Sequence, residues 1–121
     1  MRQILSRRYA VTWTTGDSAY VYSEQVPAGH VIHVKSCMGY SEQRDASDDV
    51  VLGYTDGGEK IIVTAMATLA AQMGVAASRD FYVGEGDKVF AYFPDVENND
   101  VIELHINGTL ITRADFEKGT E

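Results

Sequence analysis

Apolar and β-branched residues recur along the chain in short runs that Gly, Asp, Asn and Pro separate. Runs of this length, bounded by turn-forming residues, are typical of antiparallel strands joined by tight turns. About eight strands at this spacing indicate an all-β domain, and we expect an antiparallel β-sandwich of the jelly-roll type, because packing two sheets together also protects strand edges. The predicted strands cover residues 9–14, 19–24, 30–40, 49–55, 59–65, 79–83, 88–93, 101–106 and 109–112.

Alternation of apolar and polar residues predicts which side chains form the core. In the longest strand, Ile32, Val34 and Met38 fall on one face, whereas His33 and Lys35 fall on the other. We expect the apolar set to point inward. The same alternation near the C-terminus opposes Ile102, Leu104 and Ile106 to Glu103 and His105.

Turn-forming sequences connect the predicted strands. In the sequence 26–29, Pro27 suits the second position of a turn and Gly29 its close. The most secure hairpin is expected at Asn107-Gly108, because both residues tolerate the positive φ of a type I′ turn. Other hairpins are expected at Asp56-Gly57-Gly58 and Gly84-Glu85-Gly86-Asp87, and a further turn at Gly16-Asp17.

The sequence leaves two structures open for residues 66–77. Gly74 and β-branched neighbours weaken helix propensity, so an extended crossover fits as well as a short helix. The uncharged segment 61–78 reaches the length of a membrane helix, but polar residues interrupt it, and we expect no membrane span. The residues at helical spacing are Met66, Leu69, Ala70 and Met73.

Charge is distributed unevenly along the chain. The net charge of −8 opposes a phosphate backbone, so nucleic acid is not an expected partner. Residues 1–16 carry +3 and the remainder −11, which indicates a basic N-terminal arm with Arg2, Arg7 and Arg8 as partner-binding residues. A frayed, solvated terminus is the alternative. The expected organisation is an arm over 1–8, a β-sandwich domain over 9–113 and a C-terminal tail over 114–121.

Groups with catalytic or metal-binding potential are few. Cys37 is the only cysteine, which excludes an internal disulfide and fits a reducing cytoplasm, and the N-terminus lacks the apolar stretch of a signal peptide. His30 and His33 follow Gly29 in a manner similar to the cupin metal site, but positions three apart face opposite sides of a strand. His105 shares no motif with either histidine. We therefore expect no catalytic residue, cofactor or metal, and no enzymatic activity.

Two further groupings admit a binding role. Trp13, Tyr20 and Tyr22 are placed to form an aromatic platform for a sugar or a protein, although strand aromatics also form core and cross-strand pairs. Two groups of acidic residues offer oxygen ligands for calcium, but neither matches a defined loop, and solvated loops are the simpler interpretation. These groups are Asp45, Asp48 and Asp49, and Asp95, Glu97 and Asp100.

A series of turn and strand sequences runs in order from Val26 to Thr112. It comprises Val26-Pro27-Ala28-Gly29, Leu52-Gly53, Asp56-Gly57-Gly58, the run from Phe81 to Val89, Ala91-Tyr92-Phe93 and the run from Asp100 to Leu104. This order resembles small β-sandwich virion proteins of tailed bacteriophages, in particular head decoration (cement) proteins, and tail or neck proteins of the same phages have similar segments. The resemblance implies a jelly-roll-like domain without catalytic residues, docked on the outside of an icosahedral shell.

The resemblance also implies partners and a location. The major capsid protein would be the partner, and the protein would form a dimer or trimer on the particle, because symmetric shells favour such assemblies. It would be made in the host cytoplasm and lie on the exterior of the capsid. The basic arm would cross neighbouring capsid subunits and become ordered on binding. A carbohydrate-binding β-sandwich module and a metal-dependent cupin-like enzyme remain as alternatives from other classes.

Overall fold

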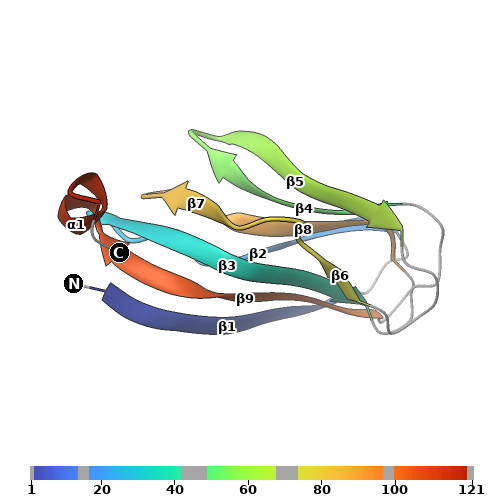
Figure 1. Ribbon diagram of the computed structural model, residues 1–121. Helices are drawn as coiled ribbons and strands as arrows, with labels where there is room; N and C mark the ends of the chain where they lie inside the picture. The colour runs from blue at the N-terminus through green and yellow to red at the C-terminus, as the bar shows by residue number, and fades with distance from the viewer. Residues whose placement is uncertain (1, 14–16, 42–48, 68–73, 97–99, 120–121) are drawn as a thin grey trace.

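The computed structural model describes residues 2–13, 17–41, 49–67, 74–96 and 100–119, which form nine strands and one short helix. The strands lie in two facing sheets (Figure 1). The all-β sandwich predicted from the sequence is confirmed. Its elements are β1 (Arg2–Trp13), β2 (Asp17–Tyr22), β3 (His30–Ser41), β4 (Asp49–Asp56), β5 (Glu59–Ala67), β6 (Gly74–Ala76), β7 (Phe81–Gly84), β8 (Val89–Val96), β9 (Asp100–Thr112) and α1 (Arg113–Glu117).

The order of the strands is that of a jelly roll. One sheet runs β1-β9-β3-β6, with β7 also paired to β3, and the other runs β2-β8-β4-β5. The antiparallel pairs form a rolled ribbon that begins at the β4–β5 hairpin and continues through β3 with β6 and β7, β2 with β8, and β1 with β9. Because β6 and β7 lie on the same side of β3 as one interrupted strand, the nine strands fill the eight places of a jelly roll.

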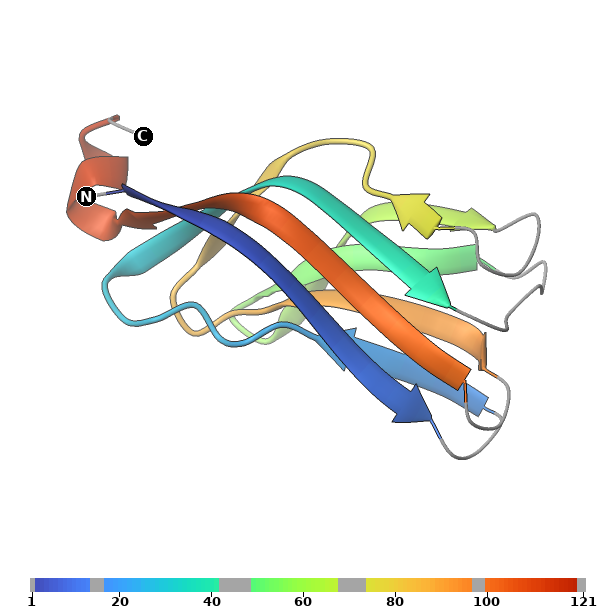
Figure 2. The same cartoon turned by 90° about the horizontal axis from the view of Figure 1, so that it is seen from below.

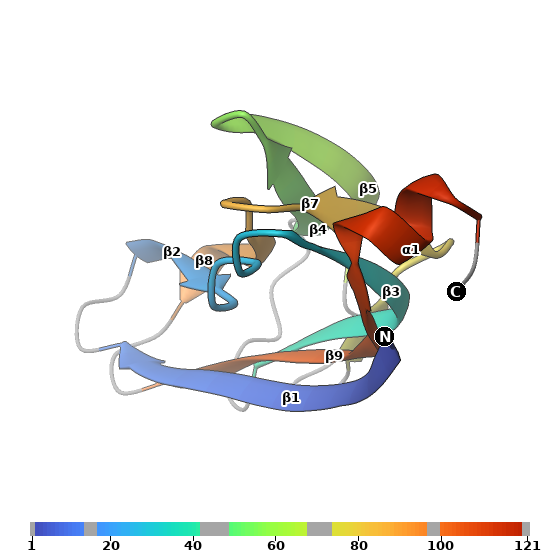
Figure 3. The same ribbon diagram turned by 90° about the vertical axis from the view of Figure 1, so that its left-hand side faces the viewer.

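The core lies between the two sheets, and the end-on view in Figure 3 shows β1 and β9 apart from β2, β8, β4 and β5. Both sheets contribute side chains that are at most 1% exposed, among them Val21, Leu52 and Phe93 from one sheet and Ile102 and Leu104 from the other. Burial of this apolar surface is the main stabilising contribution to the fold. The outer faces and the sheet edges are left as the surfaces that a partner can reach.

A bulge in β3 reverses the inward and outward positions of its second half. The register with β9 shifts between Val34 and Ser36. Before the shift Ile32 and Val34 are buried as predicted, but after it Cys37 is buried and Met38 is only half-buried. The prediction that Met38 shares the inward face is therefore wrong, because one extra residue moves later side chains to the other face. In β9 the prediction is confirmed, with Ile102, Leu104 and Ile106 buried and Glu103 and His105 half-buried.

β9 continues straight through Asn107-Gly108, so the hairpin predicted there is wrong. Gly108 lies opposite Leu5 of β1 and Val34 of β3 in the middle of the sheet. A Cβ at Gly108 would overlap the backbone carbonyl oxygen of His33. Glycine at position 108 lets the backbone of β3 approach β9 closely at the bulge. Close approach of a neighbouring backbone is a known reason for glycine inside a strand.

The other predicted turns have mixed outcomes. Gly57 and Gly58, with φ of 60° and 93°, join β4 to β5 in the predicted hairpin, and Gly29, with φ of 75°, closes the predicted turn before β3. Residues 84–87 also turn, but the predicted hairpin is wrong. β7 pairs with β3, whereas β8 pairs with β2 and β4, so this turn carries the chain from one sheet to the other.

The strands on either side of the predicted Gly16-Asp17 turn, β1 and β2, belong to different sheets and do not form a hairpin. Gly16 itself lies outside the described residues. Of residues 66–77, the described part is extended: β5 ends at Ala67 and β6 covers Gly74–Ala76, while residues 68–73 lie outside the description. No helix in the described ranges is long and apolar enough to cross a membrane.

Residues 2–8 belong to β1 and are not an arm outside the sandwich, so that expectation is wrong. Arg2 pairs with Ile111 and Arg8 with His105, and Figure 2 shows β1 lying along β9. The pattern of residues around positions 2–8 could not indicate this pairing, because β9 is separated from β1 by most of the sequence. At the other terminus, the predicted tail contains most of α1, which Thr112 caps by accepting the backbone N–H of Asp115.

Candidate interaction surfaces

β1 forms an open edge of its sheet. Among the described residues it pairs with β9 alone, in a register that runs without a shift from Arg2 to Trp13. Long edges are commonly protected by proline, a bulge, charged side chains or a covering segment, because unpaired backbone groups bind other strands. Of these devices β1 has charged side chains, its arginines. β1 contains neither proline nor glycine. Its free N–H and C=O groups therefore form a row that a partner chain can reach.

The arginines predicted to bind a partner lie on β1 but do not form one cluster. Arg8 donates from Nε to Oε1 of Glu103 at 2.7 Å, and Nε2 of His105 lies 2.8 Å from the same oxygen. Arg7 donates only to an adjacent backbone carbonyl and makes no ion pair with any described residue. The side chain of Arg2 lies outside the described residues. Arg8 thus forms an ion pair with an acid of its own chain, whereas the guanidinium of Arg7 can pair with an acid of a partner.

Arg7 lines a groove of about 170 Å³ beside the β1 edge. Alternation places it on the same face of β1 as Leu5 and Tyr9, which pack against the core. Burial raises the pKa of the Tyr9 hydroxyl. The groove thus combines one arginine and one acid, Glu24, with apolar and uncharged polar neighbours. Its lining apart from Arg7 comes from Leu5, Tyr9, Ser23, Glu24, Gln25, Pro27, Ile32, Ile106 and Leu110.

The ion pair of Arg8 predicts a pH dependence of stability. The hydrogen bond from Arg8, and to a smaller extent that from His105, holds the pKa of Glu103 below its ordinary value, against the opposite effect of burial. A lowered folded-state pKa stabilises the protein above the unfolded-state value of about 4.3, and this contribution is lost as the pH falls through the folded-state pKa.

Arg8→Gln should therefore lower the melting temperature by about 2–4 °C at pH 7, and the difference should be smaller at pH 3, below the unfolded-state pKa of Glu103. Thermal unfolding at the two pH values measures the difference. Arg7→Gln is the matched control, since it removes an arginine from the same strand without breaking an ion pair among the described residues. A gap between wild type and Arg8→Gln that is as wide at pH 3 as at pH 7 would contradict the assignment.

Tyrosines gather on the outer face of the second sheet. Tyr20 and Tyr22 are 37% and 38% exposed, and their rings stack with centroids 5.5 Å apart, while Tyr92 of β8 lies 4.6 Å from Tyr20. The Nζ atoms of Lys60 and Lys88 lie 5.1 and 5.5 Å from the ring centroids of Tyr20 and Tyr22. The two lysines thus cover faces of the Tyr20 and Tyr22 rings, whereas a platform that binds a sugar by stacking would leave its ring faces open. Of the predicted platform, the Trp13 side chain lies outside the described residues.

The three histidines lie apart and contact different partners. Nδ1 of His30 lies 3.0 Å from the carbonyl oxygen of Ala28, and Nε2 of His33 lies 2.7 Å from Oδ2 of Asp80, while His105 contacts Glu103. In the described part of the chain, no three His, Cys, Asp or Glu side chains are placed to hold one metal ion.

The two groups of acidic residues that the sequence offered as calcium ligands are described only in part. Asp100 is buried and accepts a hydrogen bond from Ser41, and Asp49 is exposed. The remaining members, Asp45, Asp48, Glu97 and the side chain of Asp95, lie outside the described residues.

Cys37 is buried in the core at 3% exposure. Burial raises the pKa of its thiol to about 12. Because the thiolate is the nucleophile and the metal ligand, a thiol with this pKa is inert at neutral pH. The surroundings of Cys37 therefore favour a structural role in the core.

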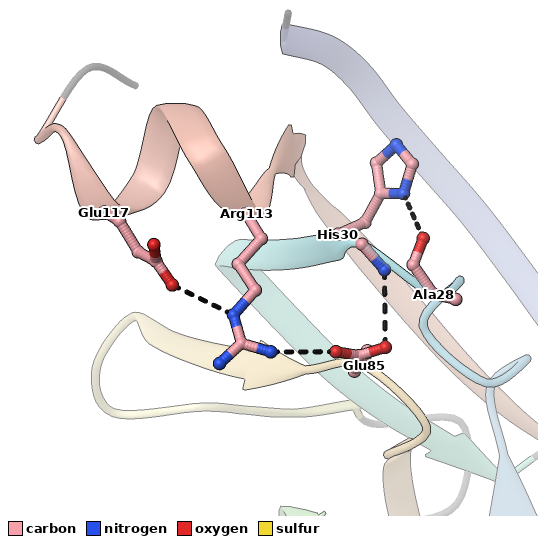
Figure 4. A network of polar contacts seen from close by, with 6 residues as sticks. Ala28, His30, Glu85, Arg113 and Glu117 are labelled. Atoms are coloured by element: carbon pink, nitrogen blue, oxygen red, sulfur yellow. Dashed lines mark hydrogen bonds and ion pairs between the residues drawn. The ribbon is translucent and has the colours of Figure 1, made fainter.

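The end of the sandwich that carries α1 is held by one arginine. Arg113 donates from Nη1 to Oε1 of Glu85 at 2.9 Å and from Nε to Oε1 of Glu117 at 3.0 Å, and the other oxygen of Glu85 accepts the N–H of Gly29 (Figure 4). The Phe116 ring lies 5.2 Å from the ring of Tyr82. Exposed ion pairs of this kind contribute little to stability, so the network mainly positions α1 against the neighbouring turns.

Comparison with solved structures shows a likeness in fold to a chain of a phage capsid structure. A chain from the acidic stable capsid of Helicobacter pylori bacteriophage KHP30 aligns with a TM-score of 0.54 and 16% identity, over 92% of this chain and 93% of that chain. The two chains share a fold. A chain of the cyanophage Pam1 capsid asymmetric unit (TM-score 0.46, 19% identity, 92% and 86% covered) and the Drosophila NLP core (0.45, 16%, 88% and 99%) are less similar. No protein-family model and no curated protein matches the sequence.

The surfaces that sequence reasoning missed depend on register. Tyr92 joins Tyr20 only because β2 pairs with β8 in a register that sets them opposite each other. The groove beside Arg7 requires both the β1–β9 pairing and the path of residues 23–27. The one available signal was the absence of acidic residues from residues 1–16, which singled out Arg2, Arg7 and Arg8.

Proposed function

We propose that this protein is a non-enzymatic structural protein of a virion, a decoration protein that docks on the outside of an assembled phage head and stabilises it. The major capsid protein is its partner, and two or three copies assemble around a symmetry axis of the shell. It is made in the host cytoplasm and ends on the capsid exterior.

One observation carries the proposal. The likeness to the phage KHP30 capsid chain covers nearly all of both chains, 92% and 93%, so it is a correspondence of whole jelly rolls. The sequence order of turns and strands, which resembles phage head decoration proteins, supports the same role independently. The long open edge of β1 adds a surface suited to docking.

Particles with and without the protein provide the test. A protein that binds only the intact shell shifts the equilibrium toward that state by mass action, so the opening temperature of the shell should rise with added protein and then saturate. Differential scanning calorimetry of purified particles measures this temperature. Equal opening temperatures at saturating protein would remove the stabilising role, and a reconstruction with the protein on the tail or inside the shell would remove the proposed position.

A further inference from the structure

We propose that the free edge of β1 is a strand-addition site, at which an extended segment of a shell protein, with a carboxylate and an apolar side chain on the same face, pairs as an additional strand. This inference rests on the proposed function for the identity of the partner, and it adds the surface and the mode of docking. In strand addition, backbone hydrogen bonds supply affinity, and alternate side chains in pockets supply specificity.

β1 differs from the other sheet edges in length and regularity. β2 has six residues and a register shift against β8, and β5 has nine residues and a register shift against β4. β6 and β7 are three and four residues long. β1 has 12 residues and no register shift. Among the described strands, it alone offers a long and regular row of free backbone groups.

The side chains beside the edge define the incoming strand. Every second side chain of an added strand points to the face of the sheet on which Leu5, Arg7 and Tyr9 lie. These side chains of the added strand therefore lie next to the groove. A cavity of roughly 150 Å³ holds a benzene-sized group, and the groove of about 170 Å³ therefore accepts one apolar side chain. Arg7, which has no ion pair among the described residues, supplies the donor for a carboxylate beside it.

The charges on β1 disfavour a second copy of this chain as the occupant. Antiparallel self-pairing along the whole strand would set Arg2 opposite Trp13, and would then place Arg7 of each copy opposite Arg8 of the other. Like charges directly opposite each other destabilise a strand pair. β1 contains no acidic residue that could offset this repulsion. Charge complementarity thus favours a partner strand that carries carboxylates.

Amide hydrogen exchange on the full chain tests the inference with two probes. One is a preparation of phage shells that lack this protein. The other is a synthetic peptide with the sequence of residues 100–106, which carries Asp100 on the same face as three apolar residues and pairs with the opposite edge of β1 as part of β9. N–H groups of an antiparallel strand point alternately to its two neighbours. Binding at the edge should therefore protect alternate β1 amides that exchange rapidly in the free protein.

Charge reversal at Arg7 tests the chemistry, with Arg79→Glu as the matched control. Both arginines are exposed, and each donates from Nη1 to an adjacent backbone carbonyl, of Ser6 or of Asp80. Arg7→Glu should weaken the binding of both probes by about tenfold or more, whereas Arg79→Glu should change it by less than about twofold. Arg7→Lys, which keeps the charge, should retain most of the affinity, and melting temperatures verify that each variant is folded.

The two probes separate failure of the inference from failure of the proposed function. Shell binding that leaves β1 amides unchanged, or that responds equally to Arg7→Glu and Arg79→Glu, overturns the edge site while the docking role stands. Peptide protection of alternate β1 amides without any shell binding supports the edge site and removes the docking role. If neither the shell nor the peptide binds, both are wrong.

Discussion

Replacing Gly108 by alanine should lower the free energy of unfolding by about 3 kcal/mol, near the upper end of what overpacking costs. The new Cβ would overlap the carbonyl oxygen of His33 and would also lie 3.1 Å from Cα of Val34. Both neighbours are backbone atoms of a central strand, so relief requires β3 and β9 to move apart. Denaturant unfolding followed by circular dichroism measures the change.

Gly84→Ala is the matched control for this effect. A Cβ at Gly84 would meet no atom within 4 Å, and its φ lies outside the left-handed region. We expect Gly84→Ala to change the unfolding free energy by less than about 0.5 kcal/mol. If Gly108→Ala were as mild as Gly84→Ala, β9 would not pass as closely by β3 as the structure indicates, and a turn at Asn107-Gly108 would again have to be considered.

Leu104→Ala should cost about 3–5 kcal/mol of unfolding free energy. Leu104 is fully buried, at 0% exposure, in the middle of β9 and between the two sheets. Its truncation removes apolar contacts and leaves a cavity that backbone paired on both sides cannot close. The same denaturation experiment measures the loss.

Ile4→Ala provides the comparison for Leu104→Ala. Ile4 is 84% exposed on β1, one strand away, and its truncation should stay within about 0.5 kcal/mol. An equally large loss for both variants would show that β1 is packed against something that the monomer does not contain. An equally small loss would place Leu104 outside the core.

The fold class could be predicted because strand alternation is a local property. Ile102, Leu104 and Ile106 alternate with polar residues, and the inward face followed directly. Pairing between strands is not local. Asn107-Gly108 has the same sequence whether it makes a turn or lets a neighbouring strand approach closely, and only the position of His33 decides between the two.

The candidate surface could be predicted only in part, for a related reason. The excess of positive charge pointed to Arg2, Arg7 and Arg8 as partner-binding residues, and this role stays a proposal. Adjacent residues of a strand face opposite sides, so the two arginines separate once β1 joins the sheet. Glu103 then pairs with Arg8 and leaves Arg7 beside the groove. No feature of the first strand alone indicates where Glu103 lies.

The pairing of the first strand with the last one also decides how this domain can fold. Arg2 is paired with Ile111, and each turn of the ribbon outward from the β4–β5 hairpin joins residues farther apart in the sequence. Such non-local pairing slows folding, because the entropy of closing long loops is lost before the stabilising contacts between the strands form. During synthesis β1 emerges before β9 and stays without this partner until β9 has left the ribosome. The edge strand is thus the part of the molecule most exposed to wrong partners before the correct one arrives.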